Sequence, residues 1–139
     1  MFLLDTNVVS EARKPLDRRS PAVSAWLDQH DPGISFLSVM TILEAEEGAL
    51  RLQRRDPARC VQLLAWVEHL LVSFHGRIIS VDTAVARQAA SLHYPNPRPE
   101  IDTLIAATAL VHGLTVVTRD MKDFEPMGVP LLNPWEWVQ

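Results

Sequence analysis

Three carboxylates of this 139-residue chain stand where a folded protein can use them for chemistry. Asp5 comes directly after the apolar run 1–4, and Asp120 follows a second apolar run, 114–117, in the sequence TVVTRD. Because ligands of parallel sheets collect beyond the carboxyl ends of the strands, both acids are candidates for one site. Asp102 belongs to the first turn of an expected helix, yet its face of that helix is apolar, with Ile105, Ala106 and Ala109. An acid turned toward an apolar face is costly unless it is paired or binds a cation.

A glutamate and a further aspartate are weaker candidates. Glu44 lies early in an expected helix among core-facing residues, and Gly48, one turn later, leaves open space beside it. Its neighbours Glu46 and Glu47 are interpreted as surface acids. From the residues alone, Glu44 is equally compatible with a functional acid and with an ordinary surface acid. Asp82 also follows an expected strand, but it stands directly before a helical pattern and is interpreted as the N-cap of that helix.

Carboxylates gathered at one sheet edge predict a hard divalent cation. Without a cation, such groups repel one another and some of them must take up protons. Oxygen ligands without histidine or cysteine partners favour Mg²⁺ or Mn²⁺, and the lone Cys60 cannot build a zinc site. These ions suit phosphoryl chemistry, in which they activate water and offset charge on the leaving oxygen. The sequence has neither a glycine-rich phosphate loop nor a G-x-S-x-G motif, so a nucleotide-triphosphate enzyme and a serine hydrolase are not favoured.

Short apolar runs that alternate with longer helical patterns must position these acids. We expect strands at 1–4, 34–39, 77–81, 114–117 and 129–132, and helices at 21–29, 41–55, 57–74, 83–93 and 100–112. Asn7 is expected to cap a turn after the first strand, which would leave Asp5 free. The alternation predicts an α/β fold of three layers, in which helices cover both faces of a mostly parallel central sheet of four or five short strands. Residues 1–139 are expected to form a single domain.

Composition and charge indicate the class of protein but not its task. A hydrophobic content of 47% and a charged content of 22% are typical of a globular protein. No apolar run reaches the length of a membrane helix and a single cysteine fits a reducing compartment, so we expect a cytoplasmic location without membrane attachment. The net charge of -4 gives no sign of an extended nucleic-acid surface. Two basic clusters, at 13–19 and 51–59, are interpreted as solvated faces.

Four sequence blocks together resemble a known family. They are LLDTNVVSE at 3–11, Glu-x-x-x-Gly at 44–48, DTLIAATAL at 102–110 and HGLTVVTRDMKDF at 112–124. In order and spacing they resemble the PIN-domain nucleases, and among these the VapC/FitB-type toxins of type II toxin–antitoxin systems. The ending LLNPWEW at 131–137 is similar to the FitB-like subgroup. The resemblance spans essentially the whole chain and implies a PIN-like fold.

The resemblance implies a Mg²⁺-dependent endoribonuclease that hydrolyses RNA phosphodiester bonds with a metal-activated water, with Mn²⁺ as the alternative ion. By motif position, the family's metal-binding and catalytic acids fall on Asp5, Glu44, Asp102 and Asp120. The small polar residues that would orient these carboxylates and water are Thr6, Asn7 and Thr118. Asp123, in KDF, is the alternative to Asp120, which is favoured because it follows the strand more directly.

The chain departs from the family's pattern in two places. Ala45 follows the helix glutamate where relatives often carry Leu or Ile. The connector 94–99 is short and rich in proline, where relatives often have a longer approach. The connector bears on the RNA preference more than on catalysis.

The implied partners are a cognate VapB-type antitoxin, the RNA substrate and a second copy of the chain, within a higher toxin–antitoxin assembly. Operator DNA would be reached only through the antitoxin. In the alternative interpretation, the chain is a FitB-like partner of a DNA-binding antitoxin that acts mainly in operator binding and autoregulation, with little nuclease activity. A haloacid-dehalogenase-like phosphatase is not favoured, because Asn7 stands where that family needs a second acid.

Overall fold

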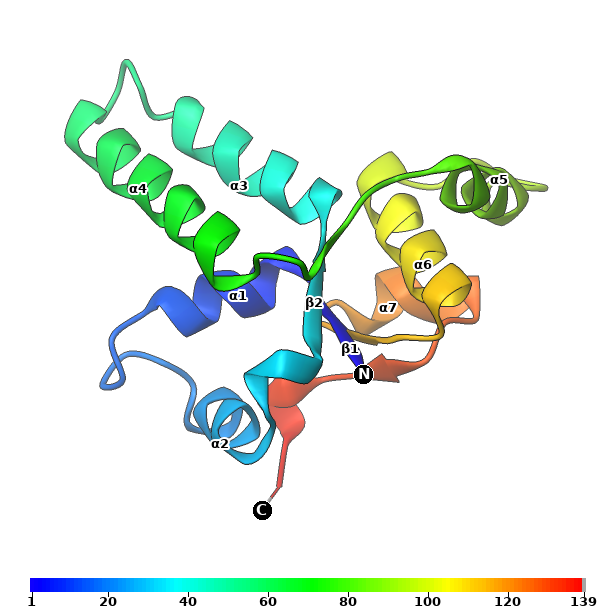
Figure 1. The fold of residues 1–139 in the computed structure, drawn as a ribbon, viewed down its shortest axis with the longest axis horizontal. Helices are drawn as coiled ribbons and strands as arrows, with labels where there is room; N and C mark the ends of the chain where they lie inside the picture. The colour runs from blue at the N-terminus through cyan, green and yellow to red at the C-terminus, as the bar shows by residue number, and fades with distance from the viewer. Residues whose placement is uncertain (139) are drawn as a thin grey trace.

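A computed structural model describes residues 1–138 (Figure 1). The strands are β1 (Phe2–Leu4), β2 (Ser35–Ser38), β3 (Ile78–Ile79), β4 (Thr115–Val117) and β5 (Leu131–Leu132). The helices are α1 (Thr6–Arg13), α2 (Pro21–Gln29), α3 (Val39–Leu50), α4 (Pro57–Ser73), α5 (Thr83–Leu92), α6 (Glu100–His112) and α7 (Met121–Phe124). The predicted α/β class is confirmed.

The five strands form one parallel sheet in the order β3-β2-β1-β4-β5. The chain adds β2 and β3 on one side of β1 and then returns to add β4 and β5 on the other. Leu4, the last residue of β1, pairs with Val117, the last residue of β4. The strand order therefore reverses between β1 and β4, and the crevice beyond such a reversal is where open α/β sheets bind ligands.

Each face of the sheet has its own hydrophobic core, because successive strand residues point to opposite faces. Leu3 and Val116 belong to the core beneath α6 and α7. Leu4 and Val117 belong to the core beneath α1, α2 and α4. Figure 1 shows the same division, with α1 to α4 on one side of β1 and β2 and α5 to α7 on the other. The predicted three-layer arrangement is confirmed.

Several helix ends lie where local sequence signals predict them. Ser20 precedes Pro21 at the start of α2, and its hydroxyl accepts the N–H of Val23 at 3.4 Å. Asp82 caps α5 by accepting the N–H of Val85 at 3.0 Å. Gly113 ends α6 with a φ of +67°, a left-handed conformation that costs little only for glycine.

The end of β1 differs from the expectation in one important respect. α1 begins at Thr6, and its N-cap is Asp5, whose carboxylate accepts the N–H of Thr6 at 2.8 Å. The expectation that Asn7 makes the turn and leaves Asp5 free is wrong, because Asn7 lies inside α1. Asp5 therefore ends the strand, caps the helix and presents a carboxylate at the same time.

Strands β2 and β3 are shorter than expected because a helix cap interrupts their pairing. The side chain of Ser38 accepts the N–H of Met40 at 3.0 Å, so β2 ends there and α3 begins at Val39. Only Ile78 and Ile79 pair with β2, and β3 is correspondingly short. α3 ends at Leu50 rather than near residue 55, and the segment 51–55 forms turns before α4.

The chain end packs on the same framework. Trp135 and Trp137 contact the core beneath α1, α2 and α4. Across residues 1–138, none of the helices has the length and apolar character that a membrane crossing requires.

Candidate active site

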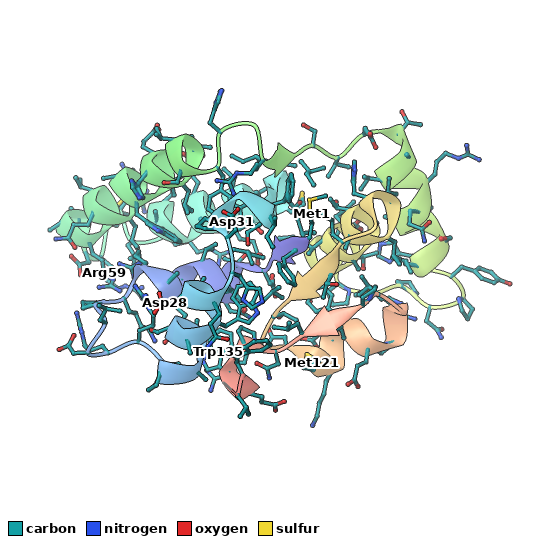
Figure 2. All side chains as sticks on the ribbon, turned by 60° about the horizontal axis from the view of Figure 1, so that its bottom comes forward. Met1, Asp28, Asp31, Arg59, Met121 and Trp135 are labelled. Carbon is teal, nitrogen blue, oxygen red and sulfur yellow. The ribbon has the colours of Figure 1, made fainter. Side chains whose placement is uncertain are left out.

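An open cavity of about 450 Å³ lies beyond the carboxyl ends of β1 and β4. Its walls are formed by Asp5, Thr6, Asn7, Ser10, Glu11, Lys14, Glu44, Asp102, Arg119, Asp120 and Trp135. Trp135, which forms one wall, is labelled in Figure 2. The four predicted acids thus come together from the β1–α1 junction, α3, α6 and the segment between β4 and α7.

Asp5 is the most buried of these acids, with 5% of its surface exposed. Its carboxylate accepts the N–H of Thr6 and the hydroxyl of Thr118, both at 2.8 Å. Burial, with smaller contributions from the charges of Asp102 and Glu44, raises the pKa of Asp5 to about 6 against the opposing effect of these two hydrogen bonds. Asp5 therefore carries its charge at neutral pH at a cost to the fold.

Asp102 lies half-buried at the open end of the apolar face of α6. The neighbours predicted for that face, Ile105, Ala106 and Ala109, are fully buried. Burial is the largest influence that raises the pKa of Asp102, followed by the negative charges of Asp123, Glu44 and Asp120. The expectation that this helix directs an acid from an apolar surface into the site agrees with the structure.

Glu44 and Asp120 are both held by the first turn of α1. The Thr6 hydroxyl donates to Glu44 at 2.6 Å. The Asn7 amide donates to Asp120 at 3.1 Å and to the hydroxyl oxygen of Thr118 at 3.3 Å. The three small polar residues named from the sequence therefore contact the acids directly, although their roles in a reaction stay predictions.

Asp120 and Asp123 differ in their relation to the cavity. Asp120 lines it, and the Asp120 N–H donates to the Thr118 hydroxyl oxygen at 3.0 Å. Asp123 is not among the lining residues. Its negative charge nevertheless raises the pKa of Asp102 more than the negative charge of Asp120 does. Both acids lie near Asp102, and the choice of Asp120 as the fourth acid stays a prediction.

Two cations line the same cavity, and both are engaged elsewhere. The Lys14 ammonium donates to Glu11 at 2.7 Å, and Glu11 also accepts the N–H of Ser20 at 2.8 Å. The Arg119 guanidinium lies 5.2 Å from the centre of the Trp135 ring. Within residues 1–138, no salt bridge involves any of the four acids. Their negative charges are therefore not offset by a direct ion pair in the described chain.

Sequence reasoning did not assign Glu11, Lys14 or Arg119 to the site. Glu11 lies inside the block LLDTNVVSE, one turn of α1 beyond the predicted site residue Asn7, so helical spacing was an available signal. Arg119 stands between two site residues, and its position in TVVTRD was a second signal. Lys14 follows Glu11 by one turn at the end of α1, so the same spacing was a signal for it as well.

The donor set suits a hard cation, although the side chains do not enclose one as they stand. Among residues 1–138, no group of three or more His, Cys, Asp or Glu side chains is arranged to hold a metal ion. Glu44 and Asp120 are turned toward Thr6 and Asn7 instead. The acids offer only oxygen ligands, which Mg²⁺ prefers, and a cation would relieve the repulsion among them. The ligand types of these residues therefore fit Mg²⁺.

Comparison with known proteins tests the family of the chain. The model of the PIN domain family matches residues 2–128. The chain is 34% identical to the VapC ribonuclease Y4jK of Sinorhizobium fredii, over 98% of this chain and 99% of that protein. It is 36% identical to Toxin FitB of Neisseria gonorrhoeae, over 97% of this chain and 99% of that protein.

A solved structure shows the same architecture at similar identity. The structure of FitAB bound to an IR36 DNA fragment aligns with a TM-score of 0.85 and 34% identity, over 100% of this chain and 99% of that one. The resemblance to VapC/FitB-type proteins inferred from the four sequence blocks is confirmed. With the family model covering most of its length and the site at the expected sheet edge, the chain belongs to the PIN-domain family.

Proposed function

We propose that the chain is a Mg²⁺-dependent endoribonuclease and the toxin of a VapBC-like type II toxin–antitoxin system. The observation that carries this proposal is the convergence of four carboxylates beyond the carboxyl ends of β1 and β4, without a direct cationic partner within the described chain. Membership of the PIN-domain family supports the nuclease activity. The names of two relatives, a VapC ribonuclease and a FitB toxin, support the choice of RNA and the toxin role.

In this proposal Asp5, Glu44, Asp102 and Asp120 hold the ion, which is Mg²⁺ or alternatively Mn²⁺. When bound, the ion lowers the pKa of water and offsets charge on the leaving oxygen. The Thr6 N–H and the Thr118 hydroxyl each hold one oxygen of Asp5, so its carboxylate has a fixed orientation. Asp120 or Glu44 accepts the proton of the attacking water. No side chain acts as the nucleophile, and the products are a 5′-phosphate and a 3′-hydroxyl.

Cleavage assays with purified, antitoxin-free protein test the proposal. We expect cutting of at least one of several RNAs with Mg²⁺ and none with EDTA. Asp5→Asn and Asp102→Asn should each lower the cleavage rate by at least about 100-fold. Loss of a group that only orients a metal ligand already costs up to about 100-fold, and loss of the ligand itself should cost more. Asp28→Asn is the matched control, since Asp28 is exposed on α2, outside the cavity (Figure 2). Full activity of a folded Asp5→Asn protein would contradict the proposal.

A second candidate function rests on one comparison. The related FitAB structure is bound to a DNA fragment, which supports a chain that acts mainly in operator binding through a DNA-binding antitoxin. The same preparations distinguish the two. No cutting of any RNA, together with tight operator binding by the toxin–antitoxin complex, would favour this candidate over the nuclease.

The proposed protein partners are a cognate VapB-type antitoxin and a second copy of the chain. An apolar cavity of about 390 Å³ between α1, α2 and α4 is the proposed contact with the antitoxin. Its apolar walls include Leu4, Val9, Leu27, Trp66, Leu70 and Phe74. Operator DNA is reached only through the antitoxin in this proposal, and the cytoplasm is the proposed location. Light scattering of the chain alone and with the antitoxin measures both associations.

A further inference from the structure

A basic cavity of about 390 Å³ lies beside the acidic one, and its walls are Arg13, Lys14, Pro15, Arg18 and Arg59. The two basic clusters of the sequence, at 13–19 and 51–59, therefore meet in the fold. Lys14 lines both cavities, so the two share a wall. Figure 2 labels Arg59 near the start of α4, on the side of the loop between α1 and α2. An interpretation as separate solvated faces does not explain this convergence.

The loop that carries the first basic cluster is tied down by its own side chains. Arg19 folds back and donates to the carbonyl oxygens of Ala12 at 2.6 Å and Lys14 at 3.1 Å. The N–H of Ser20 donates to Glu11, and so does the Lys14 ammonium. The backbone of this loop is therefore fixed beside the acidic cavity at its start and at its end.

Three of the four cations in the walls of the basic cavity, all of them arginines, have no acidic partner within residues 1–138, whereas Lys14 pairs with Glu11. No acidic residue is among its walls. The Arg13 guanidinium lies 5.4 Å from the centre of the Trp66 ring, which orients the group without removing its charge. Within residues 1–138, Arg18 and Arg59 form no salt bridge. A bound anion would relieve the mutual repulsion of these exposed cations.

We propose that Arg13, Arg18 and Arg59, together with Lys14, bind backbone phosphates of a single-stranded RNA whose scissile phosphate lies in the acidic cavity. The inference rests on the proposed function, because the acidic cavity supplies the cutting site. The guanidinium group matches the geometry of a phosphate with two parallel hydrogen bonds. A flexible strand can place one phosphate among the carboxylates and its neighbours against the arginines, since the cavities adjoin.

The proposal also explains how a chain with a net charge of -4 attracts a polyanion. The charge is divided between neighbouring cavities of opposite sign. Local potential in a cleft steers a charged ligand more than the net charge of the protein does. RNA would thus approach through the basic cavity before a phosphate reaches the acids.

Fluorescence anisotropy tests the site without cleavage. The full chain is titrated into a short, fluorescein-labelled single-stranded RNA in EDTA, at several salt concentrations. The variant Arg18→Ala/Arg59→Ala should bind more weakly, and the slope of log K against log salt should fall by about 0.7 for each lost phosphate contact on a single strand, about 1.4 in all. Arg87→Ala is the control, because Arg87 is exposed on α5 and lines neither cavity. Its affinity and slope should equal those of the wild type.

Cleavage in Mg²⁺ separates this inference from the proposed function. The double variant should raise KM while kcat stays close to that of the wild type, because neither arginine lines the acidic cavity. Cleavage by the wild type, with unchanged RNA affinity and salt slope in the double variant, would overturn the phosphate site and leave the nuclease intact. A wild type that cuts no RNA, but whose RNA binding depends on Arg18 and Arg59, would contradict the nuclease and support the phosphate site.

An acidic protein segment is the competing occupant of the basic cavity. Labelled poly-glutamate in the same titration tests it. Poly-glutamate binding that the double variant loses, alongside unchanged RNA binding, would assign the cavity to such a segment and overturn the proposal. Loss of RNA binding in the double variant, with circular dichroism equal to the wild type, supports it.

Discussion

Asp5→Asn should stabilise the folded chain at neutral pH while it removes activity. Asp5 is 5% exposed, and burial raises its pKa from 3.8 to about 6. Between these pH values the folded chain holds the Asp5 proton more tightly than the unfolded chain does. The Asp5 contribution to the free energy of unfolding is therefore most favourable at low pH and is lost as the pH rises to about 6.

The size of the effect follows from the two pKa values. A rise from 3.8 to about 6 corresponds to a destabilisation of about 3 kcal/mol above pH 6, at about 1.4 kcal/mol per pKa unit. The two oxygens of Asp5 accept one hydrogen bond each, from the Thr6 N–H and from the Thr118 hydroxyl. The single side-chain oxygen of asparagine can accept only one of these two hydrogen bonds. Loss of the other hydrogen bond costs about 1–2 kcal/mol. We expect a net gain of about 1–2 kcal/mol at neutral pH and a net loss near pH 4.

Urea unfolding in EDTA at both pH values measures this difference, with Asp28→Asn as the control. Asp28 is exposed on α2, outside the acidic cavity, and its substitution should leave the stability unchanged. Addition of Mg²⁺ should reduce the advantage of Asp5→Asn, because an ion that binds the folded wild type stabilises it by mass action. An Asp5→Asn protein that is less stable than the wild type at neutral pH, with the same pH dependence, would refute the reasoning.

Three further predictions concern Glu11, which lines the acidic cavity, and two glycines of the framework. Glu11→Gln should cost about 1–2 kcal/mol at neutral pH, because its carboxylate binds half-exposed Lys14 and the backbone of Ser20. The Lys14 and Ser20 hydrogen bonds lower the pKa of Glu11 below its usual 4.5, so the difference in urea stability should disappear as the pH falls below that value. Gly113→Ala should cost about 1–2 kcal/mol because its φ is +67°. Gly48→Ala, within α3 and with open space around the added carbon, should gain about 0.5–1 kcal/mol. Similar thermal melts for the two glycine variants would contradict this assignment.

Local signals in the sequence determined most of the elements, because caps and strand ends depend on near neighbours. The pair Ser20 and Pro21 begins α2, Asp82 begins α5, and Gly113 ends α6. The apolar face of α6 also followed from helical spacing, and with it the inward placement of Asp102. The helices α1 and α7 were missed, since segments of 8 and 4 residues contain too few turns for a clear period.

The candidate acids were accessible from the sequence for a similar reason. A carboxylate directly after an apolar strand, or on an apolar helix face, needs an explanation wherever the fold places it. Asp5, Asp102 and Asp120 were therefore candidates from residue type and position alone, whereas Glu44 could be assigned only through the family resemblance. Local reasoning was wrong about the turn after β1, where Asp5 itself is the cap.

Only the tertiary structure decided which distant residues meet. The register that pairs Leu4 with Val117 brings the Thr118 hydroxyl to Asp5, 113 positions away in the chain. Lys14, at the end of α1, lines both the acidic cavity and the basic one, and residues distant in the chain complete both. Strand order, register and loop path depend on packing between elements, and no local pattern encodes them. The sequence by itself determined which residue types were available for chemistry, and the fold determined that acids and arginines from separate segments share adjoining cavities.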